Sequence, residues 1–329
     1  MGVSTTIAVD AMGGDHAPQV VLEGVELALI ADTDLRIMLT GHPQSIESFA
    51  QRYSDRVTAV GTSEVIGMDE HPAMAVKEKK DSSIVVGCQL VRSGQAGGFF
   101  SAGSTGACMA AATLYIGRIK GIFRPAIASI LPAPNKPVIL LDVGANADVK
   151  PEYLLQFAQM ASVYAQHILG VQAPRIGLLN IGEEPTKGSE LAQKAFLLLQ
   201  DKIPGFSGNV EGTDILGSDL DIIVTDGFTG NVTLKTIEGT ANTLFSLLKD
   251  ALSATLIRKI GASLVMPGLK ELKRTMSADE VGGAPLLGIK GSCIIGHGSS
   301  NAQAIANGIA VTATCVRERV FQVIAEAVG

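Results

Sequence analysis

The feature that most limits the fold of this chain is a repeated unit of apolar strand, glycine-rich turn and helix. Short, continuously apolar runs alternate with longer segments whose apolar residues recur at helical spacing. Strands without polar alternation are buried on both faces, so the repetition predicts an α/β fold with a mostly parallel sheet flanked by helices. The expected strands are 6–10, 35–40, 57–60, 98–102, 138–143, 175–181, 221–225 and 292–295; the expected helices are 18–31, 151–169, 187–201, 229–260 and 299–326.

Composition supports a packed globular protein and disfavours one class of partner. The 329 residues are 47% hydrophobic and 18% charged, which predicts about two domains of roughly 150 residues each. A net charge of −6, no tryptophan and 4% aromatic residues disfavour a nucleic-acid-binding surface. We expect a first α/β domain over 1–135 and a second over 136–329. The sequence has no clear linker, so the boundary is approximate and the chain is free to cross between domains more than once.

The four cysteines indicate a reducing compartment rather than a metal or redox site. They form no C-x-x-C pair and lie in apolar or alanine-rich stretches. The first residues lead into a strand pattern without the regions of a secretory signal, and no apolar run reaches the ~18 residues of a membrane span. We therefore expect a cytoplasmic protein with no metal and no cofactor.

The segment Ser-Ala-Gly-Ser-Thr-Gly-Ala at 101–107 ends one expected strand and opens a helix. Small side chains let a ligand approach the backbone, and free N–H groups beside two hydroxyls favour an anion. Ser104, Thr105 and Gly106 are therefore candidates for phosphate binding. The alternative is a tight turn in which Ser104 simply caps the helix.

The loop after the first strand crowds two carboxylates and an imidazole beside two glycines. A turn needs glycine and aspartate, but it does not need Asp10, Asp15 and His16 together. His16 is suited to donate to a phosphate or thioester oxygen, and equally suited to cap the next helix. Asp10 and His16 are catalytic candidates, and Gly13 and Gly14 are candidates for phosphate binding.

Four later strand ends carry polar residues of the same kind. One places a lysine at a helix start, where it opposes the helix dipole and is better explained by an anionic ligand. Each of these segments is also compatible with an ordinary surface turn. The catalytic candidates here are Asn146, Asn180, Lys187, Asp226 and His297, and the phosphate-binding candidates are Lys187 and Asn231. The helix that follows Asp226 also carries Lys235, and a carboxylate, an amide and a nearby lysine are suited to orient a phosphate.

Residues 249–274 form a basic and apolar helical segment, within an expected insertion near 244–276. They hold six basic residues against two acidic ones, and Leu264-Val265-Met266 form an apolar corner before Pro267. This combination suits a membrane surface or an acidic partner; the alternative is a helix packed on its own domain or at a dimer interface. The contact candidates are Arg258, Lys259, Leu264, Lys270, Lys273 and Arg274.

Together these motifs resemble the bacterial acyl-carrier-protein:phosphate acyltransferases, the PlsX family. The resemblance runs in order through nearly the whole chain and rests on 9–16, 101–107, 142–146, 180–188, 226–231 and 296–298. The opening motif Val-Asp-Ala-Met-Gly-Gly-Asp-His is its specific part.

The resemblance implies a two-domain architecture like that of the isocitrate and isopropylmalate dehydrogenases, which phosphotransacetylase shares. The implied reaction converts fatty acyl-acyl carrier protein and inorganic phosphate to acyl phosphate for phospholipid biosynthesis. The implied enzyme is a cytoplasmic, peripherally membrane-associated homodimer whose product feeds a membrane glycerol-3-phosphate acyltransferase. On this hypothesis Asn146 and Asn180 stabilise the oxyanion, the aspartates orient donors, and His16 or His297 protonates the leaving thiolate.

Three other functions fit parts of the same pattern. A phosphotransacetylase-like enzyme would use coenzyme A thioesters and would need a pocket for the nucleotide. A hydroxyacid dehydrogenase would need a nicotinamide site, and the missing G-x-G-x-x-G disfavours it. A membrane-bound scaffold of lipid-synthesis enzymes would use the basic segment but would leave the polar strand ends without a role.

Overall fold

The computed structural model describes residues 4–275 and 281–328, except for the side chains of Leu256 and 270–275. Within this range one sheet of eleven strands has the order β3-β2-β1-β4-β11-β10-β5-β6-β9-β7-β8. The strands are β1 (Thr5–Asp10), β2 (Leu35–Gly41), β3 (Val57–Gly61), β4 (Gly98–Ser101), β5 (Ala126–Leu131), β6 (Val138–Leu141), β7 (Ile176–Leu179), β8 (Phe206–Val210), β9 (Ile222–Val224), β10 (Ala284–Leu287) and β11 (Ser292–Ile295).

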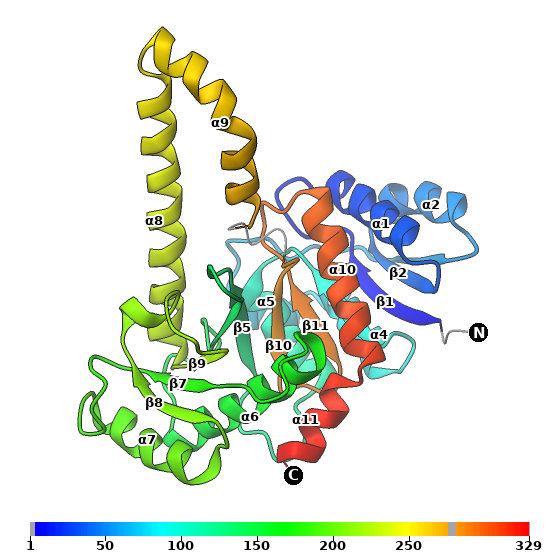
Figure 1. The fold of residues 1–329 in the computed structure, drawn as a ribbon. Coiled ribbons are helices and arrows are strands. Elements are labelled where there is room, and N and C mark those ends of the chain that lie inside the picture. The colour runs from blue at the N-terminus through cyan, green and yellow to red at the C-terminus, as the bar shows by residue number, and fades with distance from the viewer. Residues whose placement is uncertain (1–3, 276–280, 329) are drawn as a thin grey trace.

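Helices cover the sheet and connect most of its parallel strands (Figure 1). They are α1 (Gln19–Ala31), α2 (Pro43–Arg52), α3 (Pro72–Glu78), α4 (Ser83–Arg92), α5 (Thr105–Ala111), α6 (Pro151–Ile168), α7 (Glu190–Lys202), α8 (Gly227–Ser253), α9 (Leu256–Thr275), α10 (Ala302–Arg317) and α11 (Val320–Val328). A π-helical turn, Ala112–Ile116, continues α5 directly.

The sheet is mostly parallel, as the sequence predicts. Only the pairs β10–β11, β10–β5 and β5–β6 are antiparallel among the described strands. Strands β10 and β11 come late in the chain but lie between β4 and β5, in the middle of the sheet. The chain therefore builds β1 to β4, then β5 to β9, and returns to join the two halves. The division into two domains near residue 135 stays a prediction.

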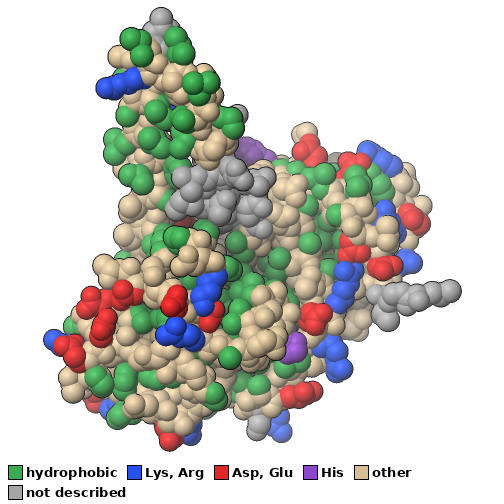
Figure 2. Space-filling view, viewed as in Figure 1, with side chains coloured by type: hydrophobic (Ala, Val, Ile, Leu, Met, Phe, Trp, Pro, Cys, Tyr) green, Lys and Arg blue, Asp and Glu red, His purple; other side chains and the backbone are tan. Residues whose placement is uncertain are grey.

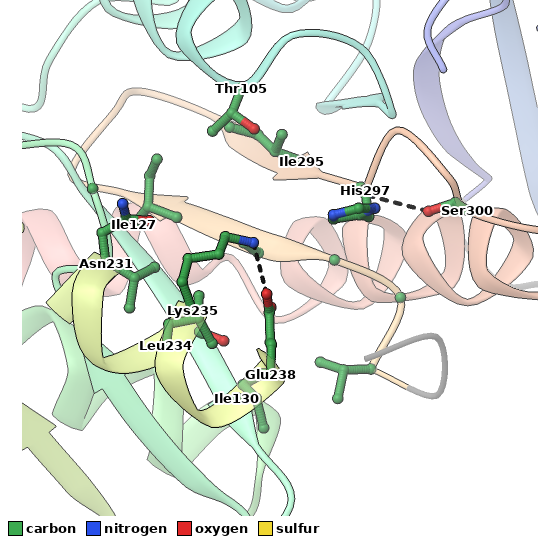
Figure 3. Close-up of a pocket in the computed structure, with 18 of the residues that line it drawn as sticks. Thr105, Ile127, Ile130, Asn231, Leu234, Lys235, Glu238, Ile295, His297 and Ser300 are labelled. Atoms are coloured by element: carbon green, nitrogen blue, oxygen red, sulfur yellow. Dashed lines mark hydrogen bonds and ion pairs between the residues drawn. The ribbon is translucent and has the colours of Figure 1, made fainter. Parts of the chain in front are cut away.

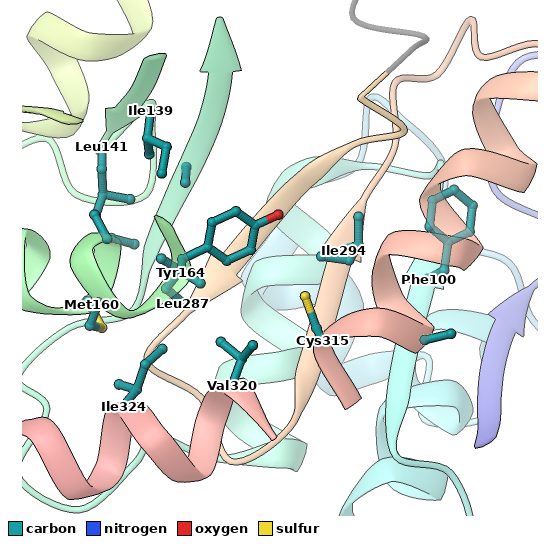
Figure 4. Packing of buried hydrophobic residues seen from close by; sticks show 14 of the residues in the cluster. Phe100, Ile139, Leu141, Met160, Tyr164, Leu287, Ile294, Cys315, Val320 and Ile324 are labelled. Atoms are coloured by element: carbon teal, nitrogen blue, oxygen red, sulfur yellow. The ribbon is translucent and has the colours of Figure 1, made fainter. Parts of the chain in front are cut away.

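Two hydrophobic clusters lie on opposite faces of this sheet. Successive residues of a strand point to opposite faces, and in β6 Ile139 and Leu141 belong to one cluster while Val138 and Leu140 belong to the other. Figure 4 shows part of the first cluster, where Tyr164 of α6 lies against the central strands and α11. Because both faces are buried there, the central strand β6 is apolar throughout.

The eight strands expected from the sequence are confirmed, but two expected helices are wrong in extent. The helix expected over 229–260 is broken into α8 and α9, because Thr255 starts a new helix by accepting the Arg258 N–H through its hydroxyl at 3.3 Å. The helix expected over 299–326 is broken at Arg319, whose φ of 53° is left-handed. The apolar corner expected before Pro267 is wrong, since α9 runs through this exposed proline.

Helices α8 and α9 form a hairpin that projects from the body of the molecule (Figure 1). Figure 2 shows hydrophobic side chains along both helices of this hairpin; Ile257 and Leu264 are 83% and 81% exposed. Arg258 and Lys259 are exposed on α9. The side chains of Lys270, Lys273 and Arg274 lie outside the described part of the structure. In the described part of the chain, none of the helices combines the length and the apolarity that crossing a bilayer requires.

Candidate active site

A cavity of about 380 Å³ lies where the two halves of the sheet meet (Figure 3). Residues that follow the carboxyl ends of β4, β6 and β11 line it, together with one face of α8. Open α/β sheets bind ligands beyond the carboxyl ends of their strands, which is where these residues lie. Its polar lining includes Thr105, Asn231, Lys235, Glu238, His297 and Ser300, and its apolar lining includes Met109, Ile127, Ile130, Leu234 and Val281.

The first wall of the cavity is the turn from β4 into α5. Ser104 is the N-cap of α5: its hydroxyl accepts the Ala107 N–H at 3.4 Å, so the capping interpretation of Ser104 is confirmed. Thr105 and Gly106 line the cavity beside it. The turn therefore supplies a hydroxyl and the start of a helical segment to the same space.

Asp10 stabilises this first wall through hydrogen bonds beneath the cavity lining. It is 1% exposed and accepts hydrogen bonds from the Ser101 hydroxyl at 2.7 Å and the Met12 N–H at 3.0 Å. The Ser101 oxygen in turn accepts the Gly103 N–H at 3.0 Å. Burial raises the pKa of Asp10 above its usual value, although these donors act in the opposite direction. Asp10 thus ties the opening loop to the turn from β4 into α5 and does not line the cavity.

The rest of the opening loop is packed rather than directed into the cavity. A Cβ on Gly13 would lie 2.6 Å from both the Asp10 Oδ2 and the Gly103 nitrogen, so this position must be glycine. Gly14 has a φ of 109°, which side chains rarely adopt. His16 is exposed and is not among the residues that line the cavity.

Asp142 plays the same part at the end of β6. It is fully buried and accepts the backbone N–H groups of Ile127 at 3.0 Å, Ala145 at 3.1 Å and Asn146 at 2.7 Å. Burial, the largest effect, raises the pKa of this carboxyl despite these donors. The Asn146 amide donates to Asp142 at 2.9 Å and to the Pro125 carbonyl at 2.8 Å. Both of its N–H donors are therefore engaged in holding the loop.

The second wall is the first part of α8, packed closely on this loop. A Cβ on Gly230 would lie 1.9 Å from the Asp142 carbonyl oxygen, so no side chain fits between helix and loop. Asn231 and Lys235 are four residues apart and share the face of α8 that lines the cavity. The Lys235 ammonium pairs with Glu238 at 2.7 Å.

The third wall is the loop from β11 to α10. A ring nitrogen of His297, Nδ1, lies 2.8 Å from the Ser299 hydroxyl, and the His297 N–H donates to the Ser300 hydroxyl at 3.2 Å. The Asp15 N–H donates to the Gly298 carbonyl at 2.8 Å, which joins the opening loop to this one. These contacts fix His297 at the edge of the cavity.

Three of the predicted catalytic residues lie elsewhere, at the ends of β7 and β9. Asn180 and Asp226 line a second cavity of about 250 Å³. Asp226 is the N-cap of α8 and accepts the Thr229 N–H at 2.8 Å and its hydroxyl at 2.7 Å. Lys187 is exposed and lines neither cavity; its carbonyl accepts the Asn180 amide at 3.1 Å.

The structure thus brings together Thr105, Gly106, Asn231 and His297 from distant parts of the sequence. The sequence pattern marked Lys235 as a lysine suited to orient phosphate, but it gave no role to Glu238, Ser300 or the apolar lining. The signal for the α8 residues was helical spacing from Asn231, at four and seven positions further on. Among the described residues, no three histidine, cysteine or acidic side chains gather closely enough to hold a metal ion.

Comparison with known proteins gives the same family over nearly the full chain. A family profile described as "Fatty acid synthesis protein" matches residues 5–323. Phosphate acyltransferase of Desulfitobacterium hafniense (strain DSM 10664 / DCB-2) is 54% identical over 313 residues, covering 94% of this chain and 93% of that protein. Phosphate acyltransferase of Bacillus subtilis (strain 168) is 47% identical over 324 residues, covering 98% and 97%.

Solved structures show the same fold at much lower identity. A phosphotransacetylase from Streptococcus pyogenes has a TM-score of 0.60 at 17% identity, covering 97% of this chain and 95% of that one. The EutD phosphotransacetylase from Staphylococcus aureus has a TM-score of 0.59 at 16% identity, covering 95% and 94%. With the family profile and the relatives above, the comparisons show that this chain belongs to the phosphate acyltransferase family and is an acyltransferase.

Proposed function

We propose that this enzyme transfers a fatty acyl group from acyl carrier protein to inorganic phosphate, giving acyl phosphate for phospholipid biosynthesis. The observation that carries the proposal is the mixed lining of the 380 Å³ cavity. Thr105, Asn231, Lys235 and His297 offer donors for a phosphate, and Ile130, Leu234 and Val281 offer an apolar surface for an acyl chain. Such a lining suits a reaction between an anion and a lipid thioester.

The reaction needs no covalent enzyme intermediate, because phosphate is itself a nucleophile. A phosphate oxygen attacks the thioester carbonyl carbon, the new carbon–oxygen bond forms, and the carbon–sulfur bond breaks. The electron pair leaves on sulfur as a thiolate, which takes up a proton. The enzyme must hold phosphate against the carbonyl and stabilise the oxyanion that forms.

The residue roles follow from the three walls. Thr105 and the backbone at Gly106 hold phosphate from one side, and Asn231 holds it from the other. His297, fixed by Ser299 and Ser300, is the proton donor to the thiolate. Asp10 is a positioning residue, because it acts through Ser101. The roles predicted for His16, Asn146, Asn180, Lys187 and Asp226 stay predictions.

The assembly and location of the enzyme belong to the same proposal. We infer a cytoplasmic homodimer with the two-domain architecture of the isocitrate and isopropylmalate dehydrogenases. The exposed apolar residues Ile257 and Leu264 beside the basic Arg258 and Lys259 support contact with a membrane surface or with an acidic carrier protein. The product would then be released near a membrane glycerol-3-phosphate acyltransferase.

A second candidate function is a phosphotransacetylase-like reaction with coenzyme A thioesters, which the shared fold favours. Release of free thiol from palmitoyl-carrier protein and from palmitoyl-coenzyme A, each with and without inorganic phosphate, distinguishes the two. We expect phosphate-dependent release at a much higher kcat/KM with the carrier protein. Phosphate-dependent thiol release from palmitoyl-coenzyme A, with none from palmitoyl-carrier protein, would replace the proposal with the second candidate.

A further inference from the structure

We propose that Lys235 is the cation that binds the reacting phosphate, and that Glu238 holds the Lys235 ammonium in the cavity until phosphate displaces it. This inference rests on the proposed function, because it names the partner of phosphate in the same cavity. It also assigns to Lys235 the role that the sequence pattern predicts for Lys187.

The charges that line the cavity point to Lys235. Among the described residues that line the cavity, Lys235 is the only lysine or arginine, and Glu238 is the only acidic residue. Near neutral pH inorganic phosphate carries one to two negative charges. Hydroxyl and amide donors do not compensate that charge in a partly enclosed site, whereas an ammonium does. Lys187 is exposed on its own loop and lines no part of this cavity.

The position of Lys235 is fixed by the packing of the first turns of α8. Close packing of Gly227 and Gly230 on the loop held by Asp142 leaves no room for the first turns of the helix to shift. Lys235 lies one turn beyond Asn231 on the same face. Figure 3 shows its side chain extending from α8 into the space faced by Thr105 and His297. A lysine held in this way meets a phosphate bound by the other two walls.

The Lys235–Glu238 pair is suited to exchange with phosphate. The two side chains are 54% and 38% exposed, so solvent screens their attraction and the 2.7 Å contact is easily replaced. A phosphate offers more charge and more acceptor oxygens than one carboxylate. Glu238 therefore orients the empty lysine and competes weakly with the substrate.

The test is initial-rate kinetics of Lys235→Ala and Lys235→Arg with palmitoyl-carrier protein and varied inorganic phosphate. A charge-assisted hydrogen bond lost from the bound anion corresponds to a rise in the phosphate KM of about 10-fold or more for Lys235→Ala. We expect the acyl-donor KM to stay within about 2-fold and Lys235→Arg to recover part of the loss. The matched control is Lys194→Ala, which breaks a similar pair with Glu190, 2.6 Å, on the exposed face of α7.

Glu238→Gln tests the second half of the proposal. Removing a competing carboxylate from a half-exposed pair should lower the phosphate KM by about 2- to 5-fold, without changing the acyl-donor KM. The corresponding control, Glu190→Gln on α7, should change neither constant. A raised phosphate KM in Glu238→Gln would mean that Glu238 assists phosphate binding and would overturn its competing role.

An unchanged phosphate KM in Lys235→Ala would overturn the assignment, as would an equal rise in the acyl-donor KM. If the phosphate KM rises in Lys187→Ala but not in Lys235→Ala, the phosphate-binding role belongs to Lys187. Calorimetric titration of wild type and Lys235→Gln with inorganic phosphate alone makes failure of the assignment distinguishable from failure of the proposed reaction. Weaker phosphate binding by the variant supports the assignment whichever acyl donor is used; equal binding overturns it.

Discussion

At the scale of single residues, the site depends on two buried aspartates that line no cavity themselves. Asp10 and Asp142 each stand at the end of a strand and accept the donors of the loop that follows. Asp10 thereby fixes the turn before Thr105, and Asp142 fixes the loop on which α8 packs. Burial of each carboxyl costs free energy that its hydrogen bonds offset in part.

Asp142→Asn should destabilise the protein by about 2–4 kcal/mol, because an amide nitrogen would replace one acceptor oxygen among several N–H donors. Asp10→Asn should cost about 1 kcal/mol, since the Ser101 hydroxyl can turn and accept from the new amide instead. Urea unfolding of both variants measures the difference. Equal losses would show that the donor count around each carboxyl does not determine its contribution.

The raised pKa of Asp10 gives a pH dependence with a definite sign. The folded state retains the proton on Asp10 at pH values where the unfolded state has lost it. The contribution of this carboxyl to stability is therefore largest below the unfolded pKa of about 3.9 and is lost as pH rises through the folded pKa. The cost of Asp10→Asn should accordingly be larger near pH 4 than at neutral pH. Urea unfolding over this range tests it, and a cost that grows with pH would contradict it.

Sequence reasoning located some of these residues and missed the partners of others. Polar residues that directly follow apolar strands can be recognised in the sequence, and this pattern pointed to Asp10, Thr105, Asn231 and His297. The engagement of Asn146 could not be foreseen, because its partner carbonyl at Pro125 is on a different strand connection. Roles set by long-range hydrogen bonds are invisible to local spacing.

At the scale of elements, helix α8 carries one wall of the cavity, and two of its three glycines, Gly230 and Gly239, have opposite roles. Gly230 lies against the Asp142 carbonyl, whereas a Cβ on Gly239 would meet nothing within 4 Å. The same residue type therefore serves close packing at the root of α8 and only weakens the helix further along.

Gly230→Ala should lower the free energy of unfolding by about 2–3 kcal/mol, since the clash is with backbone that cannot rotate away. Gly239→Ala should raise it by about 0.5–1 kcal/mol through better helix propensity. Urea unfolding of both variants provides the comparison. A stabilised Gly230→Ala would contradict the packing of α8 on the loop.

The elements that the sequence did not predict depart from the repeated unit of apolar strand and helix. Strands β5 and β10 run antiparallel within a sheet that otherwise repeats strand and helix. Strand β8, Phe-Ser-Gly-Asn-Val, is not a continuously apolar run. The break between α8 and α9 was missed because helical periodicity continues through it. Periodicity reports which face is apolar, and it does not report where the chain reverses.

At the scale of the whole molecule, the hairpin of α8 and α9 connects the cavity to the proposed contact surface. Asn231 and Lys235 lie on the first turns of α8, whereas the exposed Ile257 and Leu264 lie on α9, the other helix of the hairpin (Figures 1 and 2). One long helix thus reaches from the proposed phosphate site to the surface that would meet a membrane or an acidic carrier protein.

Leu264→Asp should reduce binding to anionic phospholipid vesicles by about 10-fold or more, because one leucine contributes about 1.5–3 kcal/mol on burial. The control is Ile30→Asp on α1, which is also strongly exposed, at 71%, but lies outside the hairpin. Vesicle co-sedimentation measures both. If Leu264→Asp binds vesicles as well as the wild type does, the hairpin does not contact the membrane. If the variant instead dissociates a dimer in sedimentation, the hairpin is an interface between subunits.

The proposed reaction, in which this chain makes acyl phosphate from an acyl-carrier protein and inorganic phosphate, can be measured directly. The purified protein is incubated with palmitoyl-carrier protein and phosphate, and acyl phosphate is trapped with hydroxylamine. We expect palmitoyl hydroxamate that requires both enzyme and phosphate. Absence of hydroxamate with the carrier protein, under conditions where coenzyme A thioesters do yield it, would show that the enzyme does not carry out the proposed reaction.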